Sequence, residues 1–306
     1  MSSRLFVGER LRRRLCLPVR IGLDSMAAEA YERLRAGEHV EPDLPLACRV
    51  FRSKPGNLFY KTALIGGQEA EENHMGKKEL PVWDLLAKRL IFEQIGPIRG
   101  LDMLDFGSGD GTTANHFAKD NRVVAIEPSE EMLKDRFEDF PYTQWVGSGE
   151  LLKRLSDASM DFILCHNVLE YVEPPCRPAI LSEFSRILRP GGTISIVKHN
   201  RAGRVMQMVV LLNNFSHARQ LLQGEDGKAA QFGAIRYYEV QDLLKWCPGL
   251  KIEKIFGFRT FWDLQQNQEI QREPYWQEQM LSVEREVSGK TEFQGIAFFH
   301  HILLKK

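Results

Sequence analysis

Residues 101–118 read LDMLDFGSGDGTTANHFA, and this stretch decides the fold class. Residues 101–105 form a short, mostly apolar run that predicts a strand, and residues 112–118 predict a helix. Gly107, Gly109 and Gly111 lie between them. Glycine permits a tight turn and lets a ligand approach the backbone without meeting a Cβ atom. The stretch therefore predicts a strand, a ligand-binding glycine turn and a helix, in that order.

The same alternation of strand and helix continues on both sides of this stretch. Apolar positions three and four residues apart predict a helix from Pro81 to Ile95, and Ser129 is a good N-cap for another. Further strands are expected over 122–127, 143–146, 161–165 and 193–197, and a further helix over 177–188. Strands that alternate with helices predict a mostly parallel sheet covered by helices on both faces. The fold class is therefore α/β.

The last third of the chain has a different pattern. Strands are expected over 251–261 and 295–304, with a helix over 274–287 between them. We expect this pair of strands to extend the parallel sheet at one edge. Residues 201–238 form an insertion with five cationic side chains against Glu225 and Asp226. The insertion follows the carboxyl end of a strand, where open α/β sheets bind ligands, so it is expected to be a cap over the site.

The first 75 residues are expected to be an extension, partly disordered, that precedes one domain over 76–306. Residues 1–22 carry six arginines and one acid, Glu9, and prolines and glycines interrupt residues 23–75. The basic start is interpreted as a dispensable extension, with translation beginning at Met26, as a transit-like segment, or as an arm that touches nucleic acid. The sequence does not distinguish these interpretations.

Composition excludes several classes of protein. The 306 residues carry 41 Lys and Arg against 41 Asp and Glu, so a polycation that coats nucleic acid is not expected. No apolar run approaches the ~18 residues of a membrane span. Five scattered cysteines without a C-x-x-C pair favour a reducing, cytoplasmic location and no zinc site. His300 and His301 would point to opposite faces of a strand, so no metal is expected.

An acidic residue strengthens the interpretation of the glycine turn. Glu127 follows Gly107 by twenty residues and ends the next expected strand, where a carboxylate can accept hydrogen bonds from ribose hydroxyls. The glycine spacing differs from the dinucleotide pattern G-x-G-x-x-G, and no Gly-Lys-Ser/Thr follows it, which excludes a P-loop. The alternative is an ordinary turn with a surface glutamate. The order of the elements favours a nucleoside-binding site.

Four segments carry a resemblance to a known class of enzyme. LDFGSGDGTTA, VVAIEPSEEML, DFILCHNVLEYV and LRPGGTISIV resemble the ordered motifs of class I S-adenosylmethionine-dependent methyltransferases over about residues 101–198. Over about residues 75–305 the chain also resembles the bacterial tRNA 5-carboxymethoxyuridine methyltransferases. That likeness rests on HNVLEYVEPP, RPGGTISIVKHN with a later NNF, FGFRTFWD and REPYWQEQMLSVER.

The resemblance implies a fold, a cofactor and a set of binding residues. The implied fold is a Rossmann-like, seven-stranded, mostly parallel sheet, and the implied cofactor is S-adenosylmethionine. The residues expected to bind it are Asp105, Gly107, Ser108, Gly109, Glu127, Gly149, Glu150 and His166. Within this set Glu127 is expected to bind the ribose, and Gly149 and Glu150 are expected to lie beside the adenine. The family also uses an arginine near the N-terminal helix, for which this chain offers Lys77 and Lys78 as the nearest cations.

The expected reaction is methyl transfer to the carboxylate of a modified wobble uridine in tRNA. A carboxylate is already a nucleophile at neutral pH, so no catalytic base is predicted. Arg259 is the candidate partner of that carboxylate, because a guanidinium pairs with a carboxylate bidentately. Tyr171, Trp262 and Tyr275 are candidates for stacking on a base, although each is also compatible with a core position.

Two alternatives to the tRNA substrate remain open. The first is methylation of a small-molecule metabolite under the same cap. The second is a nucleoside-binding protein without catalysis, which the intact glycine turn and Glu127 disfavour. The sequence predicts no oligomeric state.

Overall fold

The structure is a computed structural model that describes residues 51–52, 58–59, 80–229, 233–267 and 269–306. The chain divides into two compact units, Met1–Glu69 and Ala70–Lys306. In the first unit, strand β1 (Phe51–Arg52) pairs antiparallel with β2 (Leu58–Phe59). The expectations for the basic start, and for Lys77 and Lys78, lie outside the described residues.

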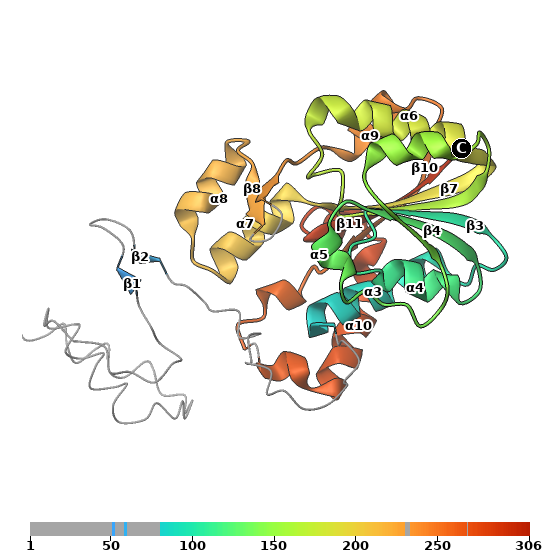
Figure 1. Cartoon of the computed structure of the whole chain (residues 1–306). Coiled ribbons are helices and arrows are strands. Elements are labelled where there is room, and N and C mark those ends of the chain that lie inside the picture. Colours follow the sequence, from blue (N-terminus) through green and yellow to red (C-terminus); the bar gives the residue numbers. More distant parts are fainter. Residues whose placement is uncertain (1–50, 53–57, 60–79, 230–232, 268) are drawn as a thin grey trace, which may run out of the picture. The chain divides into compact units, whose positions relative to one another are not determined.

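A seven-stranded sheet forms the centre of the second unit (Figure 1). Its strands are β3 (Asp102–Phe106), β4 (Arg122–Glu127), β5 (Thr143–Val146), β6 (Met160–His166), β7 (Leu188–His199), β10 (Lys251–Phe258) and β11 (Phe299–Lys305). The order across the sheet is β10-β11-β7-β6-β3-β4-β5. The five strands from β7 to β5 all run parallel to one another. The α/β class and the Rossmann-like, mostly parallel sheet are therefore confirmed.

The two last strands, β10 and β11, lie at one edge of the sheet. β11 lies between β7 and β10 and runs antiparallel to both, with Phe299 opposite His199 and Phe258. The pair extends the sheet at one edge, as expected, and β11 adds an antiparallel strand to the mostly parallel sheet. Antiparallel neighbours do not need the crossover that parallel neighbours require, so β11 can pair beside β10, the strand that precedes it in the chain. β10 also ends at Phe258, earlier than expected, and Arg259 follows it with φ of 56°.

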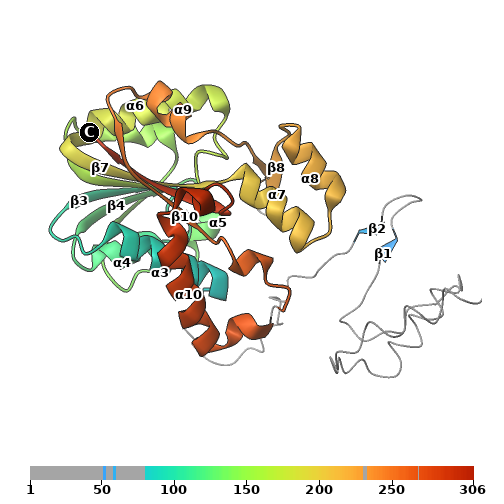
Figure 2. The same ribbon diagram turned by 180° about the vertical axis from the view of Figure 1, so that it is seen from behind.

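Helices cover both faces of the sheet. Figures 1 and 2 show α6 (Arg177–Ile187) and α9 (Val240–Trp246) on one face. On the other face are α3 (Val82–Ile95), α4 (Thr112–Ala118) and α10 (Pro274–Ser288). A short α5 (Glu130–Leu133) follows β4, and Ser129 caps it as predicted by accepting a hydrogen bond from the Met132 amide.

The core explains why the central strands are apolar throughout. Neighbouring residues of a strand point to opposite faces. In β3, Leu104 packs with Phe184 of α6, whereas Met103 packs with Phe117 of α4. Both β3 side chains are fully buried. A strand buried on both faces needs apolar residues at successive positions, which is the pattern of a parallel sheet.

The segment after β7 contains α7 (Arg201–Val210), α8 (Phe215–Leu222) and a hairpin of β8 (Gly227–Ala229) and β9 (Gly233–Ile235). A small core of Met208, Ala218 and Leu221 joins its two helices. At Gly203 a Cβ atom would lie 2.2 Å from the Ala297 carbonyl oxygen. Glycine therefore allows α7 to lie directly against the segment that leads into β11.

Candidate functional site

The glycine turn lies at the carboxyl end of β3, where it is tied to the neighbouring strand. The amides of Gly107 and Ser108 donate hydrogen bonds to the Ile126 carbonyl oxygen at 2.8 and 3.0 Å. Gly107 has φ of 76°, and a Cβ atom there would lie 2.4 Å from Val168 Cγ2. Both the backbone conformation and the space therefore require glycine at this position.

The Glu127 carboxylate faces the glycine turn and also stabilises it through hydrogen bonds. Its side chain is 8% exposed. One carboxylate oxygen accepts a hydrogen bond from the Gly109 amide, and the other accepts one from the Ser129 amide, each at 2.9 Å. A carboxylate can accept about four hydrogen bonds, so acceptor capacity remains for a ligand. The sequence predicted the ligand role, which remains a prediction, but it gave no sign of this support of the turn.

Three buried polar atoms at the turn have no hydrogen-bond partner among the described residues. They are Asp105 Oδ2, Ser108 Oγ and His166 Nδ1. Buried polar atoms usually have partners, so a cluster of unpaired ones indicates a position for a polar ligand. Burial raises the pKa of Asp105 to about 7. The three residues fit the polar methionine portion of S-adenosylmethionine.

A lysine that the sequence analysis missed lies beside this cluster. Lys88, on α3, donates a hydrogen bond to Thr113 Oγ1 at 2.5 Å. Burial lowers its pKa, while the nearby carboxylates of Asp105 and Asp110 act in the opposite direction. Lys88 supplies a cation at the turn, where Lys77 and Lys78 had been considered. No distinct signal in the sequence indicated this role, because Lys88 is followed by a second cation, Arg89, between the apolar positions Ala87 and Leu90.

Gly149 and Glu150 begin a 3₁₀ turn (Gly149–Arg154) that follows β5, at the same sheet edge as Glu127. The Glu150 carboxylate accepts hydrogen bonds from the Ser148 amide and hydroxyl, which lower its pKa. At Gly149 a Cβ atom would make only ordinary contact with Ile180, at 3.6 Å. Available space therefore does not require glycine here, and an adenine contact by these two residues stays a prediction.

A second group of polar residues surrounds Tyr171, which follows β6. Arg204 on α7 and Tyr237 after β9 both lie close enough to alter the pKa of Tyr171. Glu170 is 1% exposed, and burial raises its pKa to about 7. Unpaired buried atoms occur here too, among the described residues, at Glu170 Oε2, His199 Nδ1, Arg204 Nε and Tyr237 Oη. These residues come from the carboxyl ends of β6 and β7 and from the insertion over 201–238, so they form a second polar site.

Arg259 lies near this second site but already has an anionic partner. Its guanidinium pairs bidentately with the Asp263 carboxylate at 2.8 and 2.5 Å, and both side chains are mostly buried. The guanidinium also lies 5.1 Å from the ring centroids of Phe298 and Phe299. The bidentate contact that we expected with a substrate carboxylate is therefore made by Asp263. Arg204, whose Nε has no partner among the described residues, is the better placed cation.

The two remaining aromatic candidates have contrasting environments. Trp262 is 1% exposed and packs in the core with Phe258 and Leu281, so it is not a surface for stacking. Tyr275 is 78% exposed near the start of α10. Within the described residues no group of three or more His, Cys, Asp or Glu could hold a metal ion, and no helix could cross a membrane.

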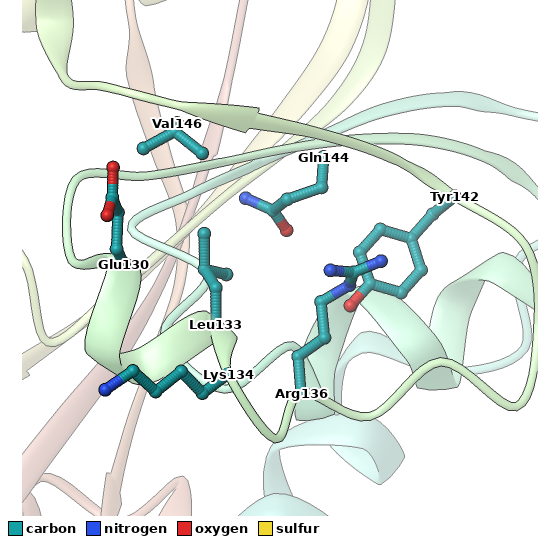
Figure 3. A pocket seen from close by; sticks show the side chains of 7 residues that line it. All are labelled: Glu130, Leu133, Lys134, Arg136, Tyr142, Gln144 and Val146. Carbon is teal, nitrogen blue, oxygen red and sulfur yellow. The ribbon is translucent and has the colours of Figure 1, made fainter.

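A cavity of about 430 Å³ lies between α5 and β5 (Figure 3). Its lining residues are Glu130, Leu133, Lys134, Arg136, Tyr142, Gln144 and Val146. None of them is a predicted site residue. Tyr142 supports the glycine turn from this side, since a Cβ atom at Gly111 would lie 2.2 Å from Tyr142 Oη.

Residues 104–196 match the family described as methyltransferase domain. A thiol S-methyltransferase from Mus musculus is 31% identical over 123 residues, which are 37% of this chain and 50% of the relative. A tRNA 5-carboxymethoxyuridine methyltransferase from Escherichia coli strain K12 is 25% identical over 228 residues, which are 71% of this chain and 84% of the relative. The solved structure of a methyltransferase from Archaeoglobus fulgidus is 17% identical, covers 74% of this chain and 95% of that one, and has a TM-score of 0.47.

The matched segment runs from β3 to β7 and contains both the glycine turn and Glu127. The chain spans about half the length of the thiol S-methyltransferases that it matches. Residues 104–196 are therefore similar to the methyltransferase domain class, whose members transfer methyl groups. The cofactor of this class is S-adenosylmethionine.

Proposed function

We propose that this protein transfers a methyl group from S-adenosylmethionine to an anionic acceptor that enters at the second polar site. The observation that carries the proposal is the position of the two sites. The unpaired atoms of the glycine turn and those around Tyr171 lie at the carboxyl ends of neighbouring strands of one sheet. A methyl donor and a methyl acceptor need this proximity, because the transfer proceeds in line over a short distance.

The cofactor side of the proposal assigns a role to each residue at the turn. Glu127 accepts hydrogen bonds from the ribose, and Gly107 lets the turn pack against Val168. Lys88 faces the carboxylate of the methionine portion, for which a cation is the natural partner. Gly149 and Glu150 lie beside the adenine. When bound, S-adenosylmethionine would supply an electrophilic methyl group on a positively charged sulfur.

The charges around Tyr171 support an anionic acceptor. Arg204 and Arg259 both lie near this residue group, and only Arg259 has a carboxylate partner within 4 Å among the described residues. A carboxylate that accepts a methyl group becomes a neutral ester and releases no proton, so the reaction needs alignment rather than a base. Arg204 would hold the anion, and Tyr171 and Tyr237 would orient it.

The carboxylate of a modified wobble uridine in tRNA is the acceptor that we favour. The tRNA methyltransferase relative matches along 84% of its length, whereas the thiol methyltransferase matches along 50%. The insertion over 201–238 also has a net charge of +3, from five cations and two acids, which favours a polyanionic substrate. A small metabolite that carries an anionic group is the second candidate, because the thiol methyltransferases match at higher identity.

The experiment supplies purified protein with labelled S-adenosylmethionine and tRNA from a strain that lacks the gene. Label that enters one tRNA nucleoside and is released by mild alkali, as an ester would be, supports the proposal. Label that enters only small molecules from a cell extract supports the metabolite alternative. Cofactor binding without any transfer would instead support a nucleoside-binding protein.

A further inference from the structure

We propose that Ser195, His301 and Gln94 are positioning residues that fix the protonation pattern of His166, so that its Nδ1 presents a lone pair to a proton donor in the cofactor site. The inference rests on the proposed function in one respect, that the glycine turn binds S-adenosylmethionine. It extends that function to residues on three elements, none of which was predicted as part of the site.

The four side chains form a continuous series of hydrogen bonds across the sheet. His166 Nε2, at the end of β6, lies 2.8 Å from Ser195 Oγ on β7. Ser195 Oγ lies 2.8 Å from His301 Nε2 on β11. His301 Nδ1 lies 2.6 Å from Gln94 Oε1 on α3.

Burial protects this series of hydrogen bonds from water. Ser195 and His301 are both fully buried, so water does not compete for their hydrogen bonds. A serine hydroxyl buried in the middle of a sheet lowers stability relative to an apolar residue unless it is hydrogen-bonded. Both hydrogen bonds of Ser195 are needed to offset this loss, so the two histidines are linked through its hydroxyl.

The direction of the hydrogen bonds follows from the acceptor at the far end. With the Gln94 amide oriented so that its oxygen faces His301, the oxygen accepts, and His301 carries its proton on Nδ1 and leaves Nε2 bare. Ser195 then donates to His301 Nε2, and its oxygen accepts from His166 Nε2–H. Neutral His166 is left with a bare Nδ1, which is the buried atom without a partner among the described residues.

The electrostatics of the site favour the same direction. Burial lowers the pKa of His166 well below its usual value, and nearby Lys88 and His301 lower it further, so the ring is neutral. A cation such as Lys88 attracts the lone pair of a neutral imidazole and repels its N–H. Lys88 lowers the pKa of His166, so it favours a ring that keeps one nitrogen bare over a ring with a second proton.

The bare Nδ1 needs a proton donor as its ligand. Two groups carry suitable protons, the ammonium of the methionine portion of the cofactor and a proton on the acceptor molecule. S-adenosylhomocysteine has that ammonium, whereas 5′-methylthioadenosine lacks the whole amino-acid portion and keeps the nucleoside. Comparing the two probes separates contacts to the ammonium from contacts to the nucleoside.

The test combines Ser195→Ala with a control on the same strand, Thr193→Val. Thr193 lies two residues from Ser195 on the same face of β7, and its hydroxyl binds Lys305 rather than a histidine. If the ammonium is the donor, Ser195→Ala should weaken S-adenosylhomocysteine binding about tenfold, the worth of one hydrogen bond. Affinity for 5′-methylthioadenosine should stay within about twofold. Thr193→Val should change neither. If the donor belongs to the acceptor, Ser195→Ala should instead raise the acceptor KM, with S-adenosylhomocysteine affinity retained.

Nitrogen-15 spectra of the histidines test the protonation pattern without any ligand. The wild type should show His166 protonated at Nε2, and Gln94→Glu, which can only accept from His301, should keep that form. Ser195→Ala and Gln94→Leu should mix the two neutral forms. Protonation of wild-type His166 at Nδ1, or unchanged affinities and acceptor KM in Ser195→Ala, would overturn the inference. A wild type that binds neither probe would refute the proposed function, while the spectra would still decide the hydrogen-bond series.

Discussion

The two polar sites of this protein are built in different ways. The cofactor site comes mainly from residues 105–129, in which two backbone amides donate to Ile126 and two more donate to Glu127. The second polar site, which is the proposed acceptor site, brings together Glu170, His199, Arg204 and Tyr237, with Arg259 beside them, and these residues are spread over ninety residues of the chain. The first site is a local structure, and the second depends on the tertiary fold.

This difference determines whether the type and spacing of residues in the sequence can predict the partners of a side chain at each site. In the cofactor site the glycines and Glu127 have backbone partners a few residues away, so their type and spacing predict their positions. In the acceptor site a charged side chain may already be paired with a distant residue. Arg259 has Asp263 as its partner, whereas Arg204 Nε has none among the described residues. Sequence spacing cannot separate these two arginines.

The largest effect is expected from Gly107→Ala, which tests whether the cofactor site is as rigid as its hydrogen bonds suggest. The left-handed backbone costs about 1–2 kcal/mol for a residue with a Cβ atom. The contact with Val168 adds about 1–3 kcal/mol of overpacking. Cofactor affinity and the free energy of unfolding should both fall, measured by calorimetry and thermal melts. Val168→Ala in the same chain should recover only the overpacking part, and an unchanged single variant would show that the turn is flexible.

Glu127→Ala should weaken S-adenosylmethionine binding by about ten- to a hundredfold, because charge-assisted hydrogen bonds are worth ~1.5–3 kcal/mol. The loss includes both the expected ribose contacts and the support of Gly109. Glu130→Ala is the matched control, since Glu130 is an exposed acid three residues away. Calorimetry that gives equal affinities for the two variants would remove Glu127 from the cofactor site.

Replacing Arg204 and replacing Arg259 should change different properties, the acceptor KM in the first case and the stability in the second. Arg204→Met should raise the acceptor KM about tenfold or more, since one charged hydrogen bond is worth ~1.5–3 kcal/mol, with little change in stability. Arg259→Met should instead lower the free energy of unfolding by about 2 kcal/mol, because the Asp263 carboxylate loses its charge-assisted hydrogen bonds. Steady-state kinetics and urea unfolding of both variants measure the contrast. An Arg259→Met protein with wild-type stability and a high KM would restore our first expectation for this residue.

A smaller effect is expected from Asp105→Asn, through pH. Burial raises the folded-state pKa of Asp105 to about 7, above its ordinary value of 3.8. A raised carboxyl pKa means that its contribution to stability is present below pH 4 and is lost as pH rises through 7. Asp105→Asn should therefore remove a loss of melting temperature that the ligand-free wild type accumulates as pH rises from about 4 to 7.

The buried histidines provide the internal check on that measurement. Burial lowers the pKa of His199 and His301 to about 3, so their contribution is lost as pH falls below about 6.5. Between about pH 4 and 6.5 the Asp105 and histidine contributions oppose each other, so the loss of melting temperature on acidification should be steeper in Asp105→Asn than in the wild type. The same profile in both proteins between pH 4 and 7 would contradict the role assigned to Asp105.

Local patterns in the sequence were sufficient for most of the parallel sheet. The expected bounds of α4, β4 and β5 are those observed, and Ser129 caps α5 as predicted. Strand periodicity, helix spacing, caps and glycine turns depend on neighbouring residues, so they can be read along the chain. The cofactor class followed from the same short segment, through the glycine turn, Glu127 and the resemblance that they carry.

The tertiary structure alone decided the direction of β11, the pairing of Arg259 with Asp263, the place of Lys88 at the turn and the series from His166 to Gln94. Each depends on a contact between different elements of the fold, and most join residues far apart in the sequence. Residue type indicates what a side chain can bind, but the fold determines which partners are within hydrogen-bond distance. For that reason the sequence by itself determined the class of this protein and its cofactor, while the arrangement of its acceptor site is a property of the folded chain.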